Sequence, residues 1–222
     1  MTTYSKLPNT ISLIGMPGAG KSTVGVILAK LTGLRFADTD LDIQVRENAT
    51  LQDILEQRDY QYLRAIEQEV LLDIALDHAV ISTGGSVVYS EQVMQRLQEA
   101  GPVVYLEAEL TLLQQRVAAA PLRGIASDQQ QSYAEIFAER TPLYRRYADI
   151  SVDAGSGGAD TGGRTGNEGC FAFEVLHFQI LYPFVYGHHY VTTAYRRYVC
   201  SDNYSVLWAP SEIITLQSQA NA

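Results

Sequence analysis

Residues 15–23, GMPGAGKST, have the types and the spacing of a phosphate-binding loop. They match the pattern G-x-x-x-x-G-K-[ST], they follow a short apolar stretch, and they open a helical pattern. Glycines let backbone N–H groups turn inward around a phosphate, and the following helix N-terminus adds positive potential. Lys21 can reach the β- and γ-phosphates, and Ser22 can ligate Mg²⁺. The expected nucleotide-binding residues in this loop are Gly15, Gly18, Ala19, Gly20, Lys21, Ser22 and Thr23.

Two carboxylates, Asp38 and Asp40, follow the apolar letters LRFA. They are two residues apart, so their side chains would share one face if the chain stays extended. One carboxylate could hold a metal ion through water, and the other could orient or deprotonate an acceptor hydroxyl. A solvated acidic turn is the alternative, and the phosphate loop nearby favours the functional interpretation.

A second pair of glycines, Gly84 and Gly85, follows the apolar letters VIS and is followed by Ser86. Without a Cβ, backbone N–H groups at this point can approach a bound acid closely. Ser86 keeps its N–H but restricts the backbone, and we expect it to be tolerated there if its φ is negative.

The elements that must position these residues are visible in the hydrophobic pattern. Short apolar or β-branched stretches predict five strands, at 10–14, 34–40, 79–82, 102–107 and 149–154. Helical spacing predicts helices over 24–33, from Thr50, over 60–76, from Ser90 to Gly101, over 110–117 and over 132–148. Alternating strands and helices with apolar strands imply an α/β fold with a parallel sheet covered on both faces. Such sheets bind ligands at the carboxyl ends of their strands, so GMPGAGKS, DTD and TGGS should converge.

The letters GMPGAGKST, FADTD, LRAIE, TGGS and ERTPLYRRYAD, in this order and spacing, resemble the shikimate kinase family over residues 10–152. The resemblance implies ATP-dependent phosphoryl transfer to a hydroxyl of shikimate, a step of aromatic amino acid biosynthesis. It also implies a P-loop kinase-like three-layer sandwich with a five-stranded parallel sheet and a mobile lid. Mg²⁺ would be held by Ser22 and, through water, by Asp38. The resemblance places in the substrate site Asp40, Arg64, Gly84, Gly85 and Arg140.

The lid departs from the family pattern, which usually has Arg-Pro-Leu. This chain has APLRGIA, so Ala120 precedes the proline and the arginine comes later. Arg116 resembles the family's arginine near adenine, and seven residues further on lies Arg123, which we assign to the lid. A lid arginine stabilises charge on the transferring phosphoryl group and helps to exclude water. The catalytic residues expected are Lys21, Asp40 and Arg123.

Bulk properties exclude some other functions. The net charge of −9 argues against a protein that binds nucleic acid by neutralising phosphates. No signal peptide and no window of eighteen apolar residues is found, so we expect no membrane association. The two cysteines, Cys170 and Cys200, form no CxxC motif, which is typical of a cytoplasmic protein with free thiols. The family resemblance implies a monomer.

The composition changes after residue 153. We expect a kinase-like domain over 1–154, a Gly-rich linker over 155–169 and an aromatic-rich tail of unknown structure over 170–222, which the family resemblance does not cover. Three functions stay open: a shikimate kinase, a kinase of the same fold for another small hydroxylated acid, and a catalytically weak nucleotide-binding regulator. Ser86, the shifted lid arginine and the missing last helix favour the second. The presence of Lys21, Asp40 and Arg140 favours catalysis.

Overall fold

The computed structural model describes residues 9–120, 124–128, 131–155, 195–198 and 207–210. The chain divides into two compact units, Met1–Val185 and Tyr186–Ala222. In the second unit, β6 (Tyr195–Tyr198) and β7 (Leu207–Pro210) form an antiparallel pair. Both cysteines and most of the predicted linker lie outside the described residues. The predicted division into domain, linker and tail therefore stays a prediction.

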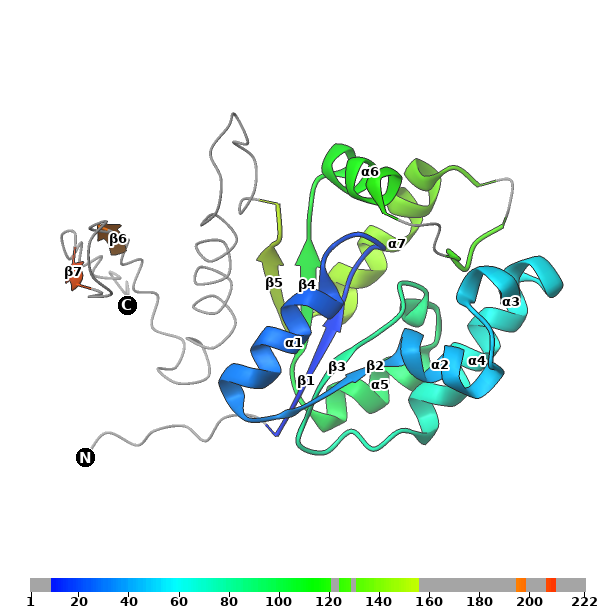
Figure 1. Cartoon of the computed structure of the whole chain (residues 1–222), viewed down its shortest axis with the longest axis horizontal. Helices are drawn as coiled ribbons and strands as arrows, with labels where there is room; N and C mark the ends of the chain where they lie inside the picture. The colour runs from blue at the N-terminus through cyan, green and yellow to red at the C-terminus, as the bar shows by residue number, and fades with distance from the viewer. Residues whose placement is uncertain (1–8, 121–123, 129–130, 156–194, 199–206, 211–222) are drawn as a thin grey trace, which may run out of the picture. The chain divides into compact units, whose positions relative to one another are not determined.

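A five-stranded parallel sheet forms the centre of the first unit, as the sequence predicts (Figure 1). The strand order is β2-β3-β1-β4-β5, and all four neighbouring pairs are parallel. Leu13 pairs with Ser82 on one side and with Val104 on the other, so β1 is central. The strands are β1 (Thr10–Ile14), β2 (Arg35–Asp38), β3 (Ala79–Ser82), β4 (Val103–Glu107) and β5 (Ile150–Asp153).

Helices cover both faces of this sheet. Helix α1 lies on one face, and α5 and α7 lie on the other (Figure 1). Helices α2, α3 and α4 pack together beyond the β2 edge around a second apolar cluster that contains Ile43, Ile54 and Ile66. The helices are α1 (Lys21–Thr32), α2 (Thr39–Glu47), α3 (Leu51–Gln57), α4 (Tyr60–Asp73), the 3₁₀ turn η1 (Val87–Tyr89), α5 (Glu91–Ala100), α6 (Leu110–Ala119) and α7 (Tyr133–Tyr147).

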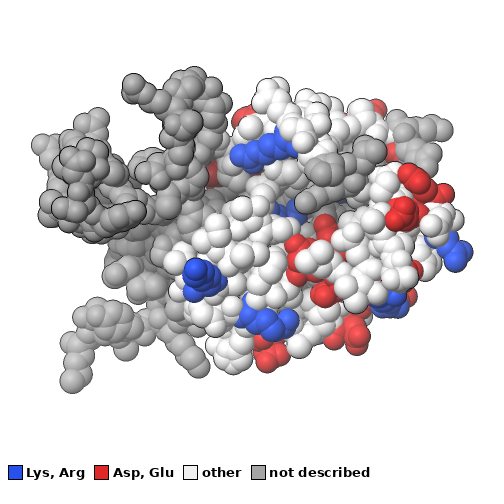
Figure 2. Space-filling view, viewed as in Figure 1, with Lys and Arg blue, Asp and Glu red and all other residues white. Residues whose placement is uncertain are grey.

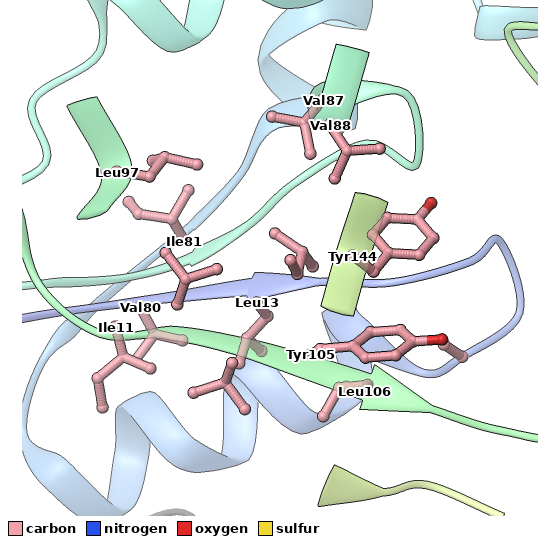
Figure 3. Close-up of a cluster of buried hydrophobic side chains, with 14 of the residues drawn as sticks. Ile11, Leu13, Val80, Ile81, Val87, Val88, Leu97, Tyr105, Leu106 and Tyr144 are labelled. Carbon is pink, nitrogen blue, oxygen red and sulfur yellow. The ribbon is translucent and has the colours of Figure 1, made fainter. Parts of the chain in front are cut away.

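The main core explains why the strands are apolar throughout. Every residue of β1 and of β3 is buried, because helices cover the sheet on both sides. Figure 3 shows side chains of these strands packed with Leu97 of α5 and Tyr144 of α7. The rings of Tyr105 and Tyr144 stack with centroids 5.1 Å apart. Burying one aliphatic side chain of β1 or β3 stabilises the fold by roughly 1.5–3 kcal/mol.

The predicted helix boundaries at polar residues are confirmed. Thr50 forms a capping box with Asp53 at the start of α3. The Ser90 hydroxyl accepts from the N–H of Val93 and begins α5, which ends at Gly101. These caps satisfy backbone groups that a helix end leaves without an intrahelical partner. Helix α4 ends at Asp73, three residues before the predicted end.

One prediction is wrong, and it concerns the two carboxylates. Strand β2 ends at Asp38, and Asp40 lies in the first turn of α2, a helix that the hydrophobic pattern did not predict. The Asp38 side chain accepts from the N–H of Asp40 at 3.1 Å and so caps α2. The two side chains therefore do not share a strand face. An N-cap aspartate followed by acidic residues in the first turn was the overlooked signal.

Candidate active site

A cavity of about 450 Å³ lies where the loops after β1, β2 and β3 converge. The predicted convergence of GMPGAGKS, DTD and TGGS at the carboxyl ends of the strands is thus confirmed. On the side of the phosphate loop, the cavity is lined by Gly18, Gly20, Lys21, Ser22, Thr23, Arg116 and Ala120. It is lined on the other side by Asp40, Glu67, Gly84, Gly85, Ser86, Ala126 and Arg140.

The phosphate loop has the backbone that its glycines predict. Gly15, Gly18 and Gly20 all have positive φ, at 146°, 85° and 93°. Gly20 is the N-cap of α1, so the loop ends at the helix N-terminus. Gly15 is not among the cavity-lining residues. A Cβ on it would lie 2.8 Å from the carbonyl oxygen of Leu106, so glycine is needed there for packing.

Lys21 is buried at the start of α1. Its Nζ donates to the carbonyl oxygens of Gly15 at 2.8 Å and Met16 at 3.1 Å. Burial lowers the pKa of Lys21, and the carboxylates of Asp40 and Asp38 partly oppose this shift. The ammonium group is therefore held by carbonyls of its own loop, inside the cavity where a phosphate would bind.

The hydroxyl and carboxylate groups near Lys21 could hold a divalent cation. The Oγ atoms of Ser22 and Ser82 are 3.4 Å apart, at the start of α1 and the end of β3. Asp38 is buried at the end of β2, and Asp40 is half-buried and lines the cavity. The described residues contain no cluster of three or more His, Cys, Asp and Glu that could bind a metal. Mg²⁺ commonly needs only one or two carboxylates, because phosphates and water supply its other ligands.

The backbone of the TGGS turn tolerates its serine. Ser86 has φ −91° and ψ −2°, in the right-handed helical region, so the expectation of a negative φ is confirmed. A Cβ on Gly84 would overlap Glu67 Oε1 and would lie 3.1 Å from Asp40 Oδ1. A Cβ on Gly85 would lie 3.0 Å from Arg140 Nη1. The two glycines thus let three charged side chains approach the turn. The Gly84 N–H itself donates to the Thr39 hydroxyl at 3.1 Å.

Glu67 lines the cavity but is not among the site residues that the sequence predicts. Its carboxyl group is buried on α4 and accepts a short hydrogen bond from the Ser86 hydroxyl. Burial raises its pKa to about 7. Among the described residues, its Oε1 atom has no hydrogen-bond partner. The sequence feature that points to Glu67 is a charged residue four positions after Leu63, on the apolar face of a helix.

The two arginines predicted to bind a carboxylate lie together but differ in burial. Arg140 is fully buried on α7 and lines the cavity. Its Nη2 donates to the carbonyl oxygen of Ala126 at 2.6 Å. Arg64 is half-buried on α4, and its Nε donates to the same oxygen at 3.2 Å. The Ala126 carbonyl oxygen thus accepts from both guanidinium groups, but Arg64 is not among the cavity-lining residues.

The lid assignment is only partly covered by the structure. Arg116 lines the cavity, and it donates to the carbonyl oxygens of Gly18 at 3.4 Å and Ala154 at 3.1 Å. Arg123 lies outside the described residues. The structure thus brings Arg116 to the phosphate loop, where an adenine contact is expected.

A parallel sheet of this order, with a phosphate loop between β1 and α1 and a polar cavity above it, defines the class of P-loop small-molecule kinases. Residues 17–161 match the family model "Shikimate kinase". The chain belongs to the shikimate kinase family.

Similar proteins agree with this family. Shikimate kinase 2 of Escherichia coli O1:K1 / APEC is 38% identical over 147 residues, which cover 64% of this chain and 84% of that protein. Shikimate kinase of Mycobacterium avium (strain 104) is 41% identical over 145 residues, which cover 64% and 81%. The solved shikimate kinase from Acinetobacter baumannii in complex with shikimate has a TM-score of 0.62 and 30% identity. That match covers 80% of this chain and 95% of the solved one.

Proposed function

We propose that this ATP-dependent kinase transfers the γ-phosphoryl group of ATP to a hydroxyl of shikimate, giving shikimate 3-phosphate and ADP. The observation that carries the proposal is the single cavity in which Lys21, Asp40 and the buried Arg140 meet. This reaction requires a lysine that binds the phosphates, a carboxylate that binds the reacting hydroxyl, and a guanidinium group that binds the carboxylate of the acceptor. The similar protein from Acinetobacter baumannii was solved in complex with shikimate.

On the nucleotide side, the loop backbone and Lys21 would bind the phosphates of ATP. The N–H groups of the loop and the ammonium group of Lys21 would stabilise the negative charge of the transferring phosphoryl group. Arg116 lies against Gly18 and would contact the adenine. Arg123 would close over the transferred phosphoryl group, as the family resemblance implies.

Ser22 and Asp38, the latter through water, would hold Mg²⁺. The pair fits this ion, because a hydroxyl and one carboxylate leave room for phosphate oxygens and water. Bound Mg²⁺ neutralises charge on the phosphates of ATP. Asp38 already caps α2, so its side chain is held at the end of β2.

On the acceptor side, Asp40 would bind the reacting hydroxyl group. The hydroxyl oxygen forms a bond to the γ-phosphorus, and the bond from that phosphorus to the β–γ bridging oxygen breaks. The proton of the hydroxyl passes to the Asp40 carboxylate, and ADP leaves with the bridging oxygen. Phosphoryl transfer is mostly positioning and electrostatics, so the rigid first turn of α2 is a suitable support.

The acceptor carboxylate would bind Arg140 and Arg64, beside the backbone of Gly84 and Gly85. Arginine suits this role, because its planar fork matches a carboxylate with two hydrogen bonds. In the structure both arginines donate to the Ala126 carbonyl. We expect a carboxylate oxygen to take the place of that carbonyl when the acceptor binds.

The test is ATP turnover by the purified protein with shikimate, gluconate, homoserine and nucleoside monophosphates. Acceleration by shikimate alone supports the proposal, and stimulation by another acceptor but not by shikimate contradicts it. A kinase for another small hydroxylated acid is the second candidate, and the shifted lid arginine favours it. Tight ATP binding without turnover with any acceptor would favour a regulatory relative.

We expect this kinase to be a monomer in the cytoplasm that binds neither nucleic acid nor membranes. Among the described residues, no helix is long and apolar enough to span a bilayer. On the face shown in Figure 2, the described surface mixes acidic and basic side chains and carries no extended basic track. Sedimentation of the purified protein would test the monomer.

A further inference from the structure

Tyr89 lies beside the acceptor arginines, and neither the family motifs nor the proposed reaction gives it a role. It is the last residue of η1, three positions after Ser86, and it is half-buried. The Arg64 guanidinium carbon lies 4.0 Å from the centroid of the Tyr89 ring. The Arg140 guanidinium carbon lies 5.3 Å from the same centroid. One aromatic ring therefore contacts both arginines.

The Tyr89 hydroxyl is held by hydrogen bonds of its own. The Nε of Arg140 donates to it at 3.3 Å. The hydroxyl in turn donates to the Glu139 carboxylate, and this bond lowers the pKa of Glu139. Gln131 Nε2 also donates to Glu139, at 3.0 Å from its Oε2 atom. The ring and the hydroxyl thus fix Tyr89 between α4 and α7.

Two guanidinium groups that reach one oxygen atom repel each other, so something must hold them together. Arg64 and Arg140 both donate to the Ala126 carbonyl oxygen, at 3.2 and 2.6 Å. The face of an aromatic ring attracts a cation, most strongly where water is excluded. Arg140 is fully buried, so the Tyr89 ring acts on it at low dielectric. The ring therefore offsets part of the repulsion within the pair.

We propose that Tyr89 is a positioning residue that holds Arg64 and Arg140 as a matched pair for the carboxylate of the acceptor. This inference rests on the proposed function, because it requires an acceptor that is a carboxylic acid. Tyr89 is not among the cavity-lining residues, so it acts through the arginines and not on the reacting atoms. It should set the KM for the acceptor and leave phosphoryl transfer itself unchanged.

The first test is Tyr89→Leu in the full-length protein, with kcat and both KM values measured. We expect the KM for shikimate to rise roughly tenfold, as the loss of two cation–π contacts predicts. We expect kcat and the KM for ATP to stay within about twofold. The matched control is Tyr62→Leu. Tyr62 has the Arg58 guanidinium 5.3 Å from its ring centroid and donates to Glu47, but it lies outside the cavity.

Tyr89→Phe separates the ring from the hydroxyl. It keeps the stacking and removes the bonds to Arg140 and Glu139, so we expect the KM for shikimate to rise only about two- to threefold. The methyl ester of shikimate, which has no charge, provides a readout that a general structural role would not change. The ratio of kcat/KM for the acid to that for the ester should fall in both variants, and more in Tyr89→Leu.

Three outcomes would overturn the inference. The first is an unchanged acid-to-ester ratio in the variants, and Tyr89→Phe alone decides this if Tyr89→Leu does not fold. The second is a joint loss of thermal stability, kcat and affinity for both substrates, which indicates a structural role. The third is a rise of the KM for shikimate in Tyr62→Leu that equals the rise in Tyr89→Leu. If the unchanged protein does not phosphorylate shikimate, the proposed function fails instead, and the two failures are thereby distinguished.

Discussion

The hydroxyl of Ser86 donates a hydrogen bond to the carboxyl group of Glu67, and both residues are buried. This contact joins the turn after β3 to helix α4, so the cavity wall is connected to the helix that carries Arg64. The Ser86 backbone has negative φ, which a side chain tolerates without strain. The serine that follows Gly84 and Gly85 therefore has a structural partner of its own.

Glu67 should make the stability of the protein depend on pH. Burial raises its pKa from the usual 4.5 to about 7 in the folded chain. Between these values the folded state binds more protons than the unfolded state, so stability falls as pH rises. The contribution is complete below pH 4.5 and is lost as pH passes about 7. The loss is on the order of 3 kcal/mol at most.

Glu67→Gln should remove this pH dependence, measured as the free energy of unfolding in urea from pH 5 to pH 8. The matched control is Glu69→Gln on the same helix, whose side chain is exposed. A decline with pH that is as steep in Glu67→Gln as in the unchanged protein would show that another group causes it.

Ser86→Ala should destabilise the protein, because it leaves the buried carboxyl group of Glu67 without its hydroxyl donor. We expect a loss of about 1–3 kcal/mol. The loss should be larger at pH 8, where Glu67 is charged, than at pH 5. Ser90→Ala removes only the cap of α5 and should cost about 1 kcal/mol at either pH. Equal losses at pH 5 and pH 8 for Ser86→Ala would argue against the coupling to Glu67.

Lys21→Met should remove phosphoryl transfer while the fold stays intact. The side chain keeps its length, but the ammonium group that would meet the phosphates is gone. We expect kcat to fall at least about 100-fold. Lys30→Met, at the exposed end of the same helix, is the control and should keep full activity. Retention of kcat in Lys21→Met would mean that Lys21 has only a structural role.

Asp40→Asn should abolish transfer and leave nucleotide binding nearly unchanged. The amide has a similar shape but cannot accept the hydroxyl proton, so kcat should fall roughly 100- to 10,000-fold. Binding of a fluorescent ATP analogue measures the nucleotide site separately. Asp42→Asn, two residues further along α2, is the control. Loss of both binding and transfer in Asp40→Asn would show that Asp40 supports the structure of the site.

Truncation after Gly155 should leave an active kinase. The residues of the main hydrophobic core lie between Ile11 and Ala154, and so do the described cavity residues. We therefore expect circular dichroism, thermal melting and shikimate-dependent ATP turnover close to those of the full chain. A folded but inactive truncated protein would show that residues 156–222 belong to the site.

The strands and the phosphate loop could be predicted closely, because their causes are local. The burial of β1 and β3 on both faces makes them apolar throughout, and this is visible in the letters. The capping box at Thr50 and Asp53 depends on residues three apart. The prediction for Asp40 was wrong, because β2 runs directly into α2 and only an N-cap aspartate with acidic first-turn residues marks the change in the sequence. The cap made by Asp38 decides between a longer strand and a helix.

The sequence by itself determined the phosphate loop, the parallel α/β order and the residues that converge on one edge of the sheet. These follow from glycine backbone freedom and hydrophobic periodicity, which act between near neighbours. Only the tertiary structure decided that Glu67 faces Ser86, and that Tyr89 lies between Arg64 and Arg140. The pairs Glu67–Ser86 and Tyr89–Arg140 are 19 and 51 residues apart in the chain. Such contacts depend on how α4, η1 and α7 pack, and no local pattern encodes that packing.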